Sequence, residues 1–327
     1  MVSLIIPVYK NEANLDRLLP ALVELSGKSP EPMEVVFVID GSPDRCEEIL
    51  KQRLPELPLR ARLLALSRNF GSFAAIAAGL QAGKGNYFTV MAADLQEPPE
   101  LTLQALECLC SGQTDIVFGY RLGQADPGLS QFFSELFWWI YRTFVVKDMP
   151  PGGVDVFSCT RQVRDRLLEL REVNTNLLAL LFWLGFRRQF IGYRRQPRLE
   201  GKSAWNFSKK LHYCLDSIFS FTDLPIQLLL YTGIVGIGFS GLFGIVLLIA
   251  KLRGNIPVPG YTPIVLTIVF FGALTSLAFG IVGQYLWLSL QNTRNRPNFI
   301  VAESREFLPA AREIELTAPP RVTASGE

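Results

Sequence analysis

Short apolar runs alternate with amphipathic stretches from the N-terminus to about residue 120. Buried β-strands are expected at Val2–Tyr9, Met33–Asp40, Ala61–Ser67, Tyr87–Asp94 and Asp115–Arg121. Leucines recur at helical spacing between the first two runs, and an alanine-rich helix is expected after the third. Strands that alternate with helices are typical of an α/β protein with a mostly parallel, doubly wound sheet.

Polar side chains gather where these apolar runs end, at Asn11, Glu12, Asp40, Arg68, Asn69, Asp94, Gln96 and Arg121. Sheets of this kind bind ligands at the carboxyl ends of their strands, so we expect the site there. Asp94 and Gln96 offer oxygen ligands to a hard divalent cation such as Mg²⁺ or Mn²⁺, which could hold phosphates. Two simpler interpretations stay open: Asp94 caps the helix after Pro98, and Asp40 forms an Asx turn before Gly41.

The hydrophobic pattern changes near residue 224. The segments Leu224–Ala250 and Gly254–Thr293 contain no charged residue, and each is long enough for a helix across a bilayer. We predict two transmembrane helices, at about 225–250 and 262–290. Basic residues flank the pair, which favours both flanks in the cytoplasm. The N-terminus begins with a strand-like run and is not expected to be a secretory leader.

Three further stretches have distinctive patterns. Leu129 to Val145 carries a helical apolar stripe, which fits either a core helix or a helix lying on a membrane. The run from Arg187 to Lys210 is rich in basic residues, starts in an expected strand pair at Phe186–Arg198, and is interpreted as meeting lipid headgroups rather than only solvent. Ser203 to Phe221 is expected to form an amphipathic helix, and the chain from Arg294 onward a weakly ordered tail.

Composition narrows the class of protein. The net charge of +2 implies no strong attraction to nucleic acid. The five cysteines have no zinc-like spacing and are expected to be reduced thiols. At the ends of the expected strands neither a G-x-G-x-x-G nor a P-loop motif is present. Whether the chain forms a homo-oligomer is left open by these features.

Five short motifs occur in a characteristic order. They are Pro7-Val8-Tyr9 with Glu12, Ile39-Asp40-Gly41-Ser42, Ser67-Arg68-Asn69-Phe70-Gly71, Ala93-Asp94-Leu95-Gln96-Glu97-Pro98-Pro99-Glu100, and Arg198 with Gly201, Ser203 and Trp205. From about residue 1 to 295 the chain resembles polyprenyl-phosphate glycosyltransferases, the inverting GT-A-fold enzymes that include dolichyl-phosphate mannose synthases and bactoprenol glucosyltransferases. The resemblance implies a nucleotide-sugar donor such as a UDP- or GDP-sugar, and a polyprenyl phosphate acceptor.

The same resemblance implies a role for individual residues. Pro7, Tyr9, Glu12 and Asp40 would bind the nucleotide, and Asp94 and Gln96 the metal ion. Arg121, Arg198, Ser203 and Trp205 would meet the donor or acceptor phosphates. Asp94, Asp155 and Arg198 would be the catalytic set, in which Asp155 is expected to orient an arginine or the acceptor rather than to abstract a proton.

The sequence departs from the family pattern at several positions. Asn11 stands where many members have their glutamate, Phe157 replaces the arginine of the motif around Asp155, and Ala204 replaces a basic residue after Ser203. The family's D-A-D-L-Q string, called the acidic string below, begins here with Ala92 in place of its first aspartate. This replacement removes one carboxylate from the expected metal site. A catalytically impaired nucleotide-sugar-binding or scaffold subunit is therefore the alternative to an enzyme.

The expected organisation has four parts. Residues 1–200 would form the cytoplasmic GT-A-like domain and 201–223 the amphipathic juxtamembrane segment. Residues 224–293 would form the transmembrane hairpin and 294–327 the cytoplasmic tail. The expected location is a membrane, with a bacterial inner membrane favoured, and the role is in cell-envelope glycan synthesis.

Overall fold

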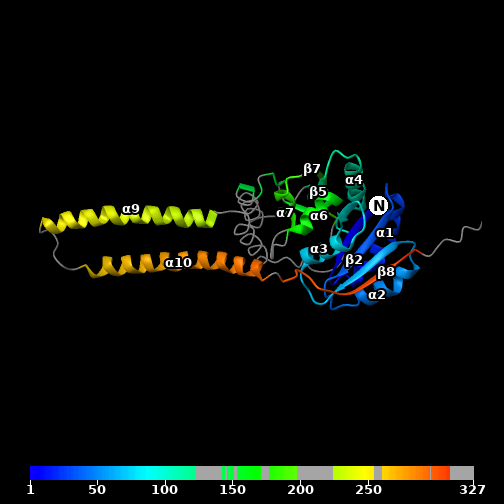
Figure 1. Ribbon diagram of the computed structural model, residues 1–327, viewed down its shortest axis with the longest axis horizontal. Helices are drawn as coiled ribbons and strands as arrows, with labels where there is room; N and C mark the ends of the chain where they lie inside the picture. The colour runs from blue at the N-terminus through cyan, green and yellow to red at the C-terminus, as the bar shows by residue number, and fades with distance from the viewer. Residues whose placement is uncertain are drawn as a thin grey trace, which may run out of the picture.

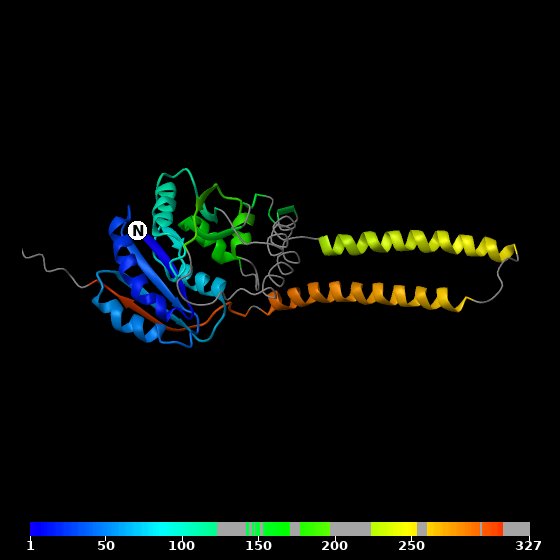
Figure 2. The same cartoon turned by 180° about the vertical axis from the view of Figure 1, so that it is seen from behind.

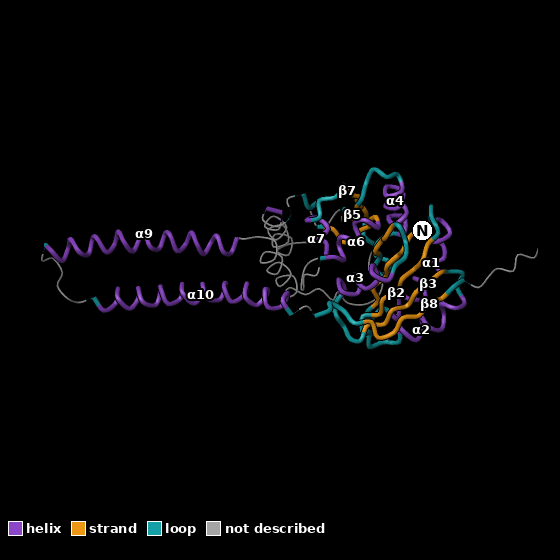
Figure 3. Tube along the Cα trace, in the orientation of Figure 1, coloured by secondary structure: helices purple, strands orange, loops and turns teal. Residues whose placement is uncertain are grey.

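The computed structural model of the chain describes residues 1–122, 142–143, 146, 148–150, 153–170, 177–196, 224–253, 260–294 and 296–309. These residues form an 8-stranded sheet with the strand order β7-β5-β6-β4-β1-β2-β3-β8. The strands are β1 (Val2–Val8), β2 (Met33–Ile39), β3 (Arg60–Leu66), β4 (Tyr87–Val90), β5 (Ile116–Arg121), β6 (Val154–Thr160), β7 (Arg188–Tyr193) and β8 (Val301–Phe307). The α-helices are α1 (Leu15–Lys28), α2 (Cys46–Arg53), α3 (Ser72–Ala82), α4 (Pro99–Cys110), α6 (Arg161–Glu169), α7 (Leu177–Trp183), α9 (Leu224–Leu252) and α10 (Tyr261–Thr293). Figure 3 shows that the strands gather in one part of the molecule, from which α9 and α10 extend.

The centre of the sheet is parallel, as the sequence predicts. Strand β1 pairs in parallel with both β2 and β4, and β2 pairs in parallel with β3. Strand β6 runs antiparallel between β4 and β5, and β8 runs antiparallel along β3. The predicted α/β fold with a mostly parallel sheet is confirmed. The prediction of two strands within Phe186–Arg198 is wrong, because the described part of this segment, up to residue 196, forms one strand, β7, which pairs in parallel with β5.

The sheet separates two hydrophobic cores because successive side chains of a strand point to opposite faces. On β1, Ile5 packs in a cluster with α3, α6 and α7. Its neighbours Leu4 and Ile6 pack in the other cluster, with α1 and α2. Since all three side chains are fully buried, the central strands are apolar on both faces. Continuous apolar strands are what a parallel sheet covered by helices on both faces requires.

Strand β8 corrects the prediction of a weakly ordered tail after Arg294. Val301 pairs with Leu66 and Phe307 pairs with Ala61, so the C-terminal chain completes the edge of the sheet. Figure 1 shows β8 lying along this edge after the chain returns from α10. The domain predicted for residues 1–200 therefore also contains residues 301–307.

Ion pairs fasten β8 to the body of the domain. The Glu306 carboxylate lies 3.1 Å from both Arg60 and Arg62 and 3.3 Å from Lys84. Only Phe307 is buried in this strand. The strand is thus held by its backbone ladder and these charges rather than by an apolar face.

Helices α9 and α10 lie side by side and point away from the sheet in both views of the molecule (Figures 1 and 2). Many of their large apolar side chains are exposed, such as Phe239 at 71% and Phe279 at 73%. Among the described residues, one stretch is long and apolar enough to cross a membrane by length and composition, the 22 residues Phe270–Gln291. The other expected segments, most of 129–145, the juxtamembrane segment 201–223 and the tail beyond residue 309, lie outside the described residues.

We predict that Glu306→Lys loosens β8, because a fourth cation would then stand beside Arg60, Arg62 and Lys84. The free energy of unfolding should fall by roughly 1–2 kcal/mol at low salt, and by less at high salt, where surface charges are screened. Thermal unfolding of the purified protein in detergent measures this. The control is Glu107→Lys, the same charge change at an exposed position of α4. Equal unfolding temperatures for Glu306→Lys and Glu107→Lys at low salt would contradict the role assigned to these ion pairs.

Candidate functional site

The chain segments that follow β1 and β2 are tied together. The Lys10 backbone N–H donates to Ser42 Oγ at 2.7 Å, and the Glu12 N–H donates to Asp44 Oδ2 at 3.1 Å. The Glu12 carboxylate accepts from the backbone N–H of Arg45 at 3.0 Å and from its guanidinium. These bonds from Arg45 lower the pKa of Glu12. Glu12 thus anchors the start of α2, and its contact with a nucleotide stays a prediction.

Asp40 holds the loop after β3 in place. Its side chain is 3% exposed, and its carboxylate oxygens accept the backbone N–H groups of Phe70 at 2.7 Å and Gly71 at 2.9 Å. Gly41 lets the two loops touch, since a Cβ atom there would lie 2.4 Å from the backbone nitrogen of Asn69. Asp40 therefore organises a neighbouring loop as well as its own, and the Asx-turn interpretation does not account for its contacts.

The ends of β1 and β2 bring the predicted nucleotide-binding residues to one place. Pro7 pairs in register with Val38, and the Asp40 backbone N–H donates to the carbonyl of Val8 at 3.1 Å. Tyr9 follows directly and is 40% exposed. Pro7, Tyr9 and Asp40 are thus neighbours at the carboxyl edge of the sheet, as expected for residues that share a ligand.

Asp94 and Gln96 lie in the loop that connects β4 to α4. The helix begins after Pro98, and no side chain caps it, so the interpretation of Asp94 as a helix cap is wrong. Asp94 Oδ1 accepts the backbone N–H of Gln96 at 3.3 Å. Between them Leu95 has a φ of 53°, a left-handed conformation that is uncommon outside glycine. Such backbone outliers cluster at functional sites, which supports this loop as part of one.

Gln96 is held by the chain that follows β7. A guanidinium nitrogen of Arg195 donates to Gln96 Oε1, and the Gln196 backbone N–H donates to the Gln96 carbonyl at 3.0 Å. Gln96 is 5% exposed, whereas Arg195 is exposed. Sequence reasoning did not single out Arg195, which lies in the basic run assigned to lipid headgroups.

Asp155 joins the ends of β5, β6 and β7. Its carboxylate accepts two hydrogen bonds from Arg121, at 2.5 and 2.6 Å, and one from the Tyr193 hydroxyl at 2.7 Å. This contact agrees with the expectation that Asp155 orients an arginine. Burial and the charge of Asp155 raise the pKa of Tyr193, so this hydroxyl stays protonated and keeps donating. Burial alone would lower the pKa of Arg121, but the hydrogen bonds to Asp155, the charge of Asp155 and the contact with Tyr193 together outweigh it and raise the pKa.

Glu97 is a buried acid in the same loop. Its side chain is 7% exposed, and its Oε2 atom has no hydrogen-bond partner among the described residues. Burial first, and then the charges of Asp94 and Asp155, raise its pKa to about 7. The three acids thus influence one another electrostatically. Glu97 takes up a proton more readily than an exposed glutamate would.

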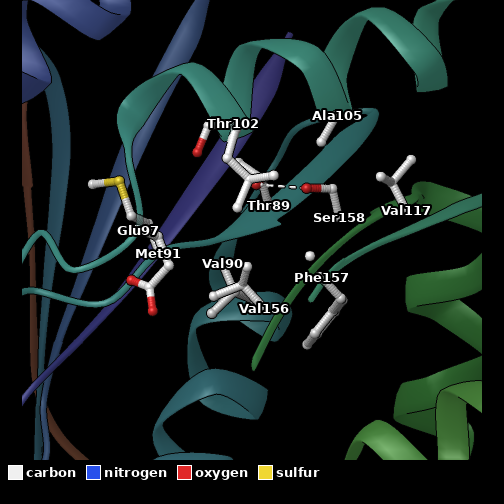
Figure 4. Close-up of a pocket in the computed structure, with 12 residues that line it drawn as sticks. Thr89, Val90, Met91, Glu97, Thr102, Ala105, Val117, Val156, Phe157 and Ser158 are labelled. Atoms are coloured by element: carbon white, nitrogen blue, oxygen red, sulfur yellow. Dashed lines mark hydrogen bonds between the residues drawn. The ribbon is translucent and has the colours of Figure 1, made fainter. Parts of the chain in front are cut away.

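A small cavity of about 10 Å³ adjoins Glu97 between α4 and strands β4, β5 and β6. Figure 4 shows the hydrogen bond between the hydroxyls of Thr89 and Ser158, which measures 2.7 Å, with Glu97 near Met91 at one side of the group. A cavity of this size has room for about one water molecule. It is too small for a nucleotide sugar and belongs to the interior rather than to the substrate site.

The described residues contain no group of three or more His, Cys, Asp or Glu side chains that could hold a metal ion. Asp94 and Gln96 nevertheless suit Mg²⁺ or Mn²⁺ chemically, because Mg²⁺ is commonly held by one or two carboxylates together with substrate phosphates. Asp94 and Gln96 would supply a partial ligand set, which phosphate oxygens and water would complete, and this assignment stays a prediction.

Two arginines of the basic run form ion pairs within the domain. Arg187 pairs with Asp115 at 2.9 Å, and Arg188 pairs with Asp148 at 3.3 Å. These two arginines therefore form ion pairs with protein carboxylates, and their contact with lipid headgroups stays a prediction. Arg198, Ser203 and Trp205 lie outside the described residues, so their roles stay predictions.

Comparisons with known proteins show the family to which the chain belongs. Residues 3–169 match the model of "Glycosyl transferase family 2". An uncharacterized glycosyltransferase of Synechocystis sp. is 30% identical over 313 residues, which cover 94% of this chain and 97% of that protein. The bactoprenol glucosyl transferase of Shigella phage SfII is 28% identical over 309 residues, covering 94% of this chain and 99% of the relative.

Among solved structures, the mannosyltransferase PcManGT of Pyrobaculum calidifontis, in complex with GDP-Man and Mn²⁺, is similar with a TM-score of 0.42. It is 13% identical and the match covers 88% of this chain and 87% of that one.

The family match over half of the chain, on a mostly parallel α/β sheet, defines a glycosyltransferase. The chain belongs to glycosyl transferase family 2 and is related over nearly its full length to bactoprenol glucosyl transferases.

We predict that Glu97 makes stability depend on pH in buffer without divalent cations. Its pKa rises from 4.5 to about 7 on folding, so its stabilising contribution is complete below pH 4.5 and is lost as the pH rises through 7. Glu97→Gln stays neutral and lacks this loss. As the pH rises through this range, the free energy of unfolding of the variant should therefore increase relative to that of the parent protein, by on the order of 3 kcal/mol in total.

Denaturant unfolding in detergent at several pH values measures the gain. The control Glu100→Gln removes an exposed carboxylate from the first turn of α4, three residues further along the chain. A constant difference between Glu97→Gln and the parent at all pH values, or the same trend in Glu100→Gln, would refute the assignment.

Proposed function

We propose that the chain transfers a sugar from a nucleotide-sugar donor to a polyprenyl phosphate at the cytoplasmic face of a bacterial inner membrane. One structural observation carries the choice of a lipid acceptor. Strand β8 starts at Val301 beside Leu66, at the carboxyl end of β3, and α10 ends at Thr293. A short connector thus joins helix α10 to the carboxyl edge of the sheet, the edge at which Asp40, Asp94 and Asp155 lie.

The names of the relatives support the same acceptor. The relative from Shigella phage SfII is called a bactoprenol glucosyl transferase, and it aligns over 94% of this chain, including α9 and α10. Exposed apolar side chains along both helices suit a lipid environment, in which they would be covered. We therefore propose that α9 and α10 form a transmembrane hairpin that holds the catalytic domain beside its lipid acceptor.

The proposed reaction is a single displacement. An acceptor phosphate oxygen attacks the anomeric carbon of the sugar, and the bond from that carbon to the diphosphate breaks. The bonding electrons leave with the nucleoside diphosphate, and the configuration inverts. Because the acceptor is already anionic at neutral pH, the reaction needs no strong general base.

The chain's own residues would bind and orient the two anions. A Mg²⁺ or Mn²⁺ ion at Asp94 and Gln96 would stabilise the charge that develops on the leaving diphosphate. Arg121, kept protonated and oriented by Asp155, can bind phosphate oxygens through its remaining donors. Pro7, Tyr9 and Asp40 would hold the nucleotide.

A non-catalytic nucleotide-sugar-binding subunit is the second candidate, because Ala92 leaves the acidic string with one carboxylate fewer. Purified protein in detergent, incubated with radiolabelled UDP- and GDP-sugars, undecaprenyl phosphate and Mn²⁺, separates the two. A labelled product that partitions into chloroform supports the enzyme. Nucleotide binding without product from any donor supports the binding subunit.

We predict that Asp94→Ala lowers transfer by at least about a hundredfold, since it removes the carboxylate that would hold the cation against the leaving group. The chloroform-extraction assay measures this at several Mn²⁺ concentrations. The matched control is Glu107→Ala, which removes an exposed carboxylate on α4. If Asp94→Ala retains full activity with an unchanged dependence on Mn²⁺, the metal assignment is wrong.

A second prediction tests the hairpin. A membrane-impermeant thiol reagent added to sealed cells should label a cysteine placed at Val258, between the helices, and not one placed at Ser304 in β8. Native Cys110, which is exposed, should be labelled only after the cells are opened, and thus reports on sealing. The reverse pattern, or labelling at both introduced positions, would show that the hairpin is inverted or absent.

A further inference from the structure

The contact between Arg195 and Gln96 has a consequence for cation binding. Gln96 Oε1 is the atom that would bind the metal ion, and it accepts a hydrogen bond from the Arg195 guanidinium. A guanidinium and a divalent cation repel each other strongly at such short range. The amide oxygen therefore serves either Arg195 or the metal ion, but not both.

The charges around the loop favour Arg195 in the donor-free protein. Ala92 contributes no carboxylate, which leaves Asp94 and Glu97 as the acids of this loop. The negative charge of Asp155 is already compensated by the two bonds from Arg121. A positive charge at Arg195, held on Gln96, thus opposes the approach of a divalent cation to this oxygen.

The geometry also allows Arg195 to leave Gln96. Its side chain is exposed, so it can move without opening the hydrophobic core. The bond from the Gln196 backbone N–H to the Gln96 carbonyl does not involve the Arg195 side chain, and it keeps the two loops together. The side chain can therefore exchange partners while the backbone stays in place.

We propose that Arg195 occupies the place of the divalent cation in the donor-free protein and gives up Gln96 when a nucleoside diphosphate arrives with the cation. The released guanidinium then binds the diphosphate, for which its planar array of donors is suited. Arg195 is thus a positioning residue that couples the binding of cation and donor. This inference rests on the proposed nucleotide-sugar donor and specifies how the same site is regulated.

The coupling has a measurable sign. Without nucleotide, Arg195 opposes the cation, so the protein binds Mn²⁺ weakly. With nucleotide, the cation and Arg195 both contact anionic oxygens, so each favours the bound donor. Coupling between two ligands of one protein is typically about 5- to 150-fold in affinity, and it is reciprocal.

Mn²⁺ binding to the full-length protein in detergent, followed by the electron paramagnetic resonance of free Mn²⁺, tests the proposal. Arg195→Gln should bind Mn²⁺ about tenfold more tightly than the parent without nucleotide. Addition of UDP or GDP should raise the Mn²⁺ affinity of the parent strongly and that of Arg195→Gln much less. The matched control is Arg194→Gln, which removes the same charge from the neighbouring exposed residue and has no hydrogen bond to Gln96 among the described contacts.

Equal tightening in Arg195→Gln and Arg194→Gln would reduce the effect to net charge and overturn the proposal. No tightening in Arg195→Gln would overturn it as well. Arg195→Lys keeps the charge but loses the planar array, and it should lie between the parent and Arg195→Gln, which provides a second variant should the first fold poorly. If the parent binds neither UDP nor GDP with Mn²⁺ present, the proposed function fails instead, whereas the comparison without nucleotide still decides whether Arg195 excludes the cation.

Discussion

The Asp155 carboxylate is the point on which the site depends. It accepts hydrogen bonds from Arg121 and Tyr193 and so joins the ends of β5, β6 and β7. Hydrogen bonds to a charged group are stronger than neutral ones, and breaking one partner leaves a partly buried charge uncompensated. The position of β7 in turn determines where Arg195 and Gln196 meet the Gln96 loop. This carboxylate therefore helps the pairing of β7 with β5 to hold the strand ends that carry Arg121 and Arg195.

The sheet and its site differ in how far the sequence predicts them. Central strands such as β1 are buried on both faces, so their apolar runs were recognisable without a structure. Polar residues directly after those apolar runs indicated the carboxyl edge, because sheets of this kind bind ligands there. Strand β8 was missed because its burial pattern has no apolar face, and its partners, Arg60 and Lys84, are more than 200 residues away in the chain.

The pattern of apolar and polar residues also does not predict side-chain contacts between distant segments. Arg195 reads as one member of a basic run, and nothing local distinguishes it from Arg194. Its bond to Gln96 joins residues 99 positions apart and exists because β7 pairs with β5. The same holds for Asp40, whose carboxylate receives the amides of a loop 30 residues further on. Local propensity cannot reveal either contact, whereas the resemblance to a family pointed to Asp40 through its motif.

The edge strand β8 also has a consequence for the order in which the chain folds. The N-terminal strands leave the ribosome first, and β8 leaves after α9 and α10, so β3 keeps an open edge through most of synthesis. An open strand edge can pair with other chains, which is a route to aggregation. The charges on β3, Arg60 and Arg62, discourage such pairing until Glu306 arrives to form ion pairs with them. Of the strands that the structure describes, β8 is thus made last and closes the sheet after all the others have been synthesised.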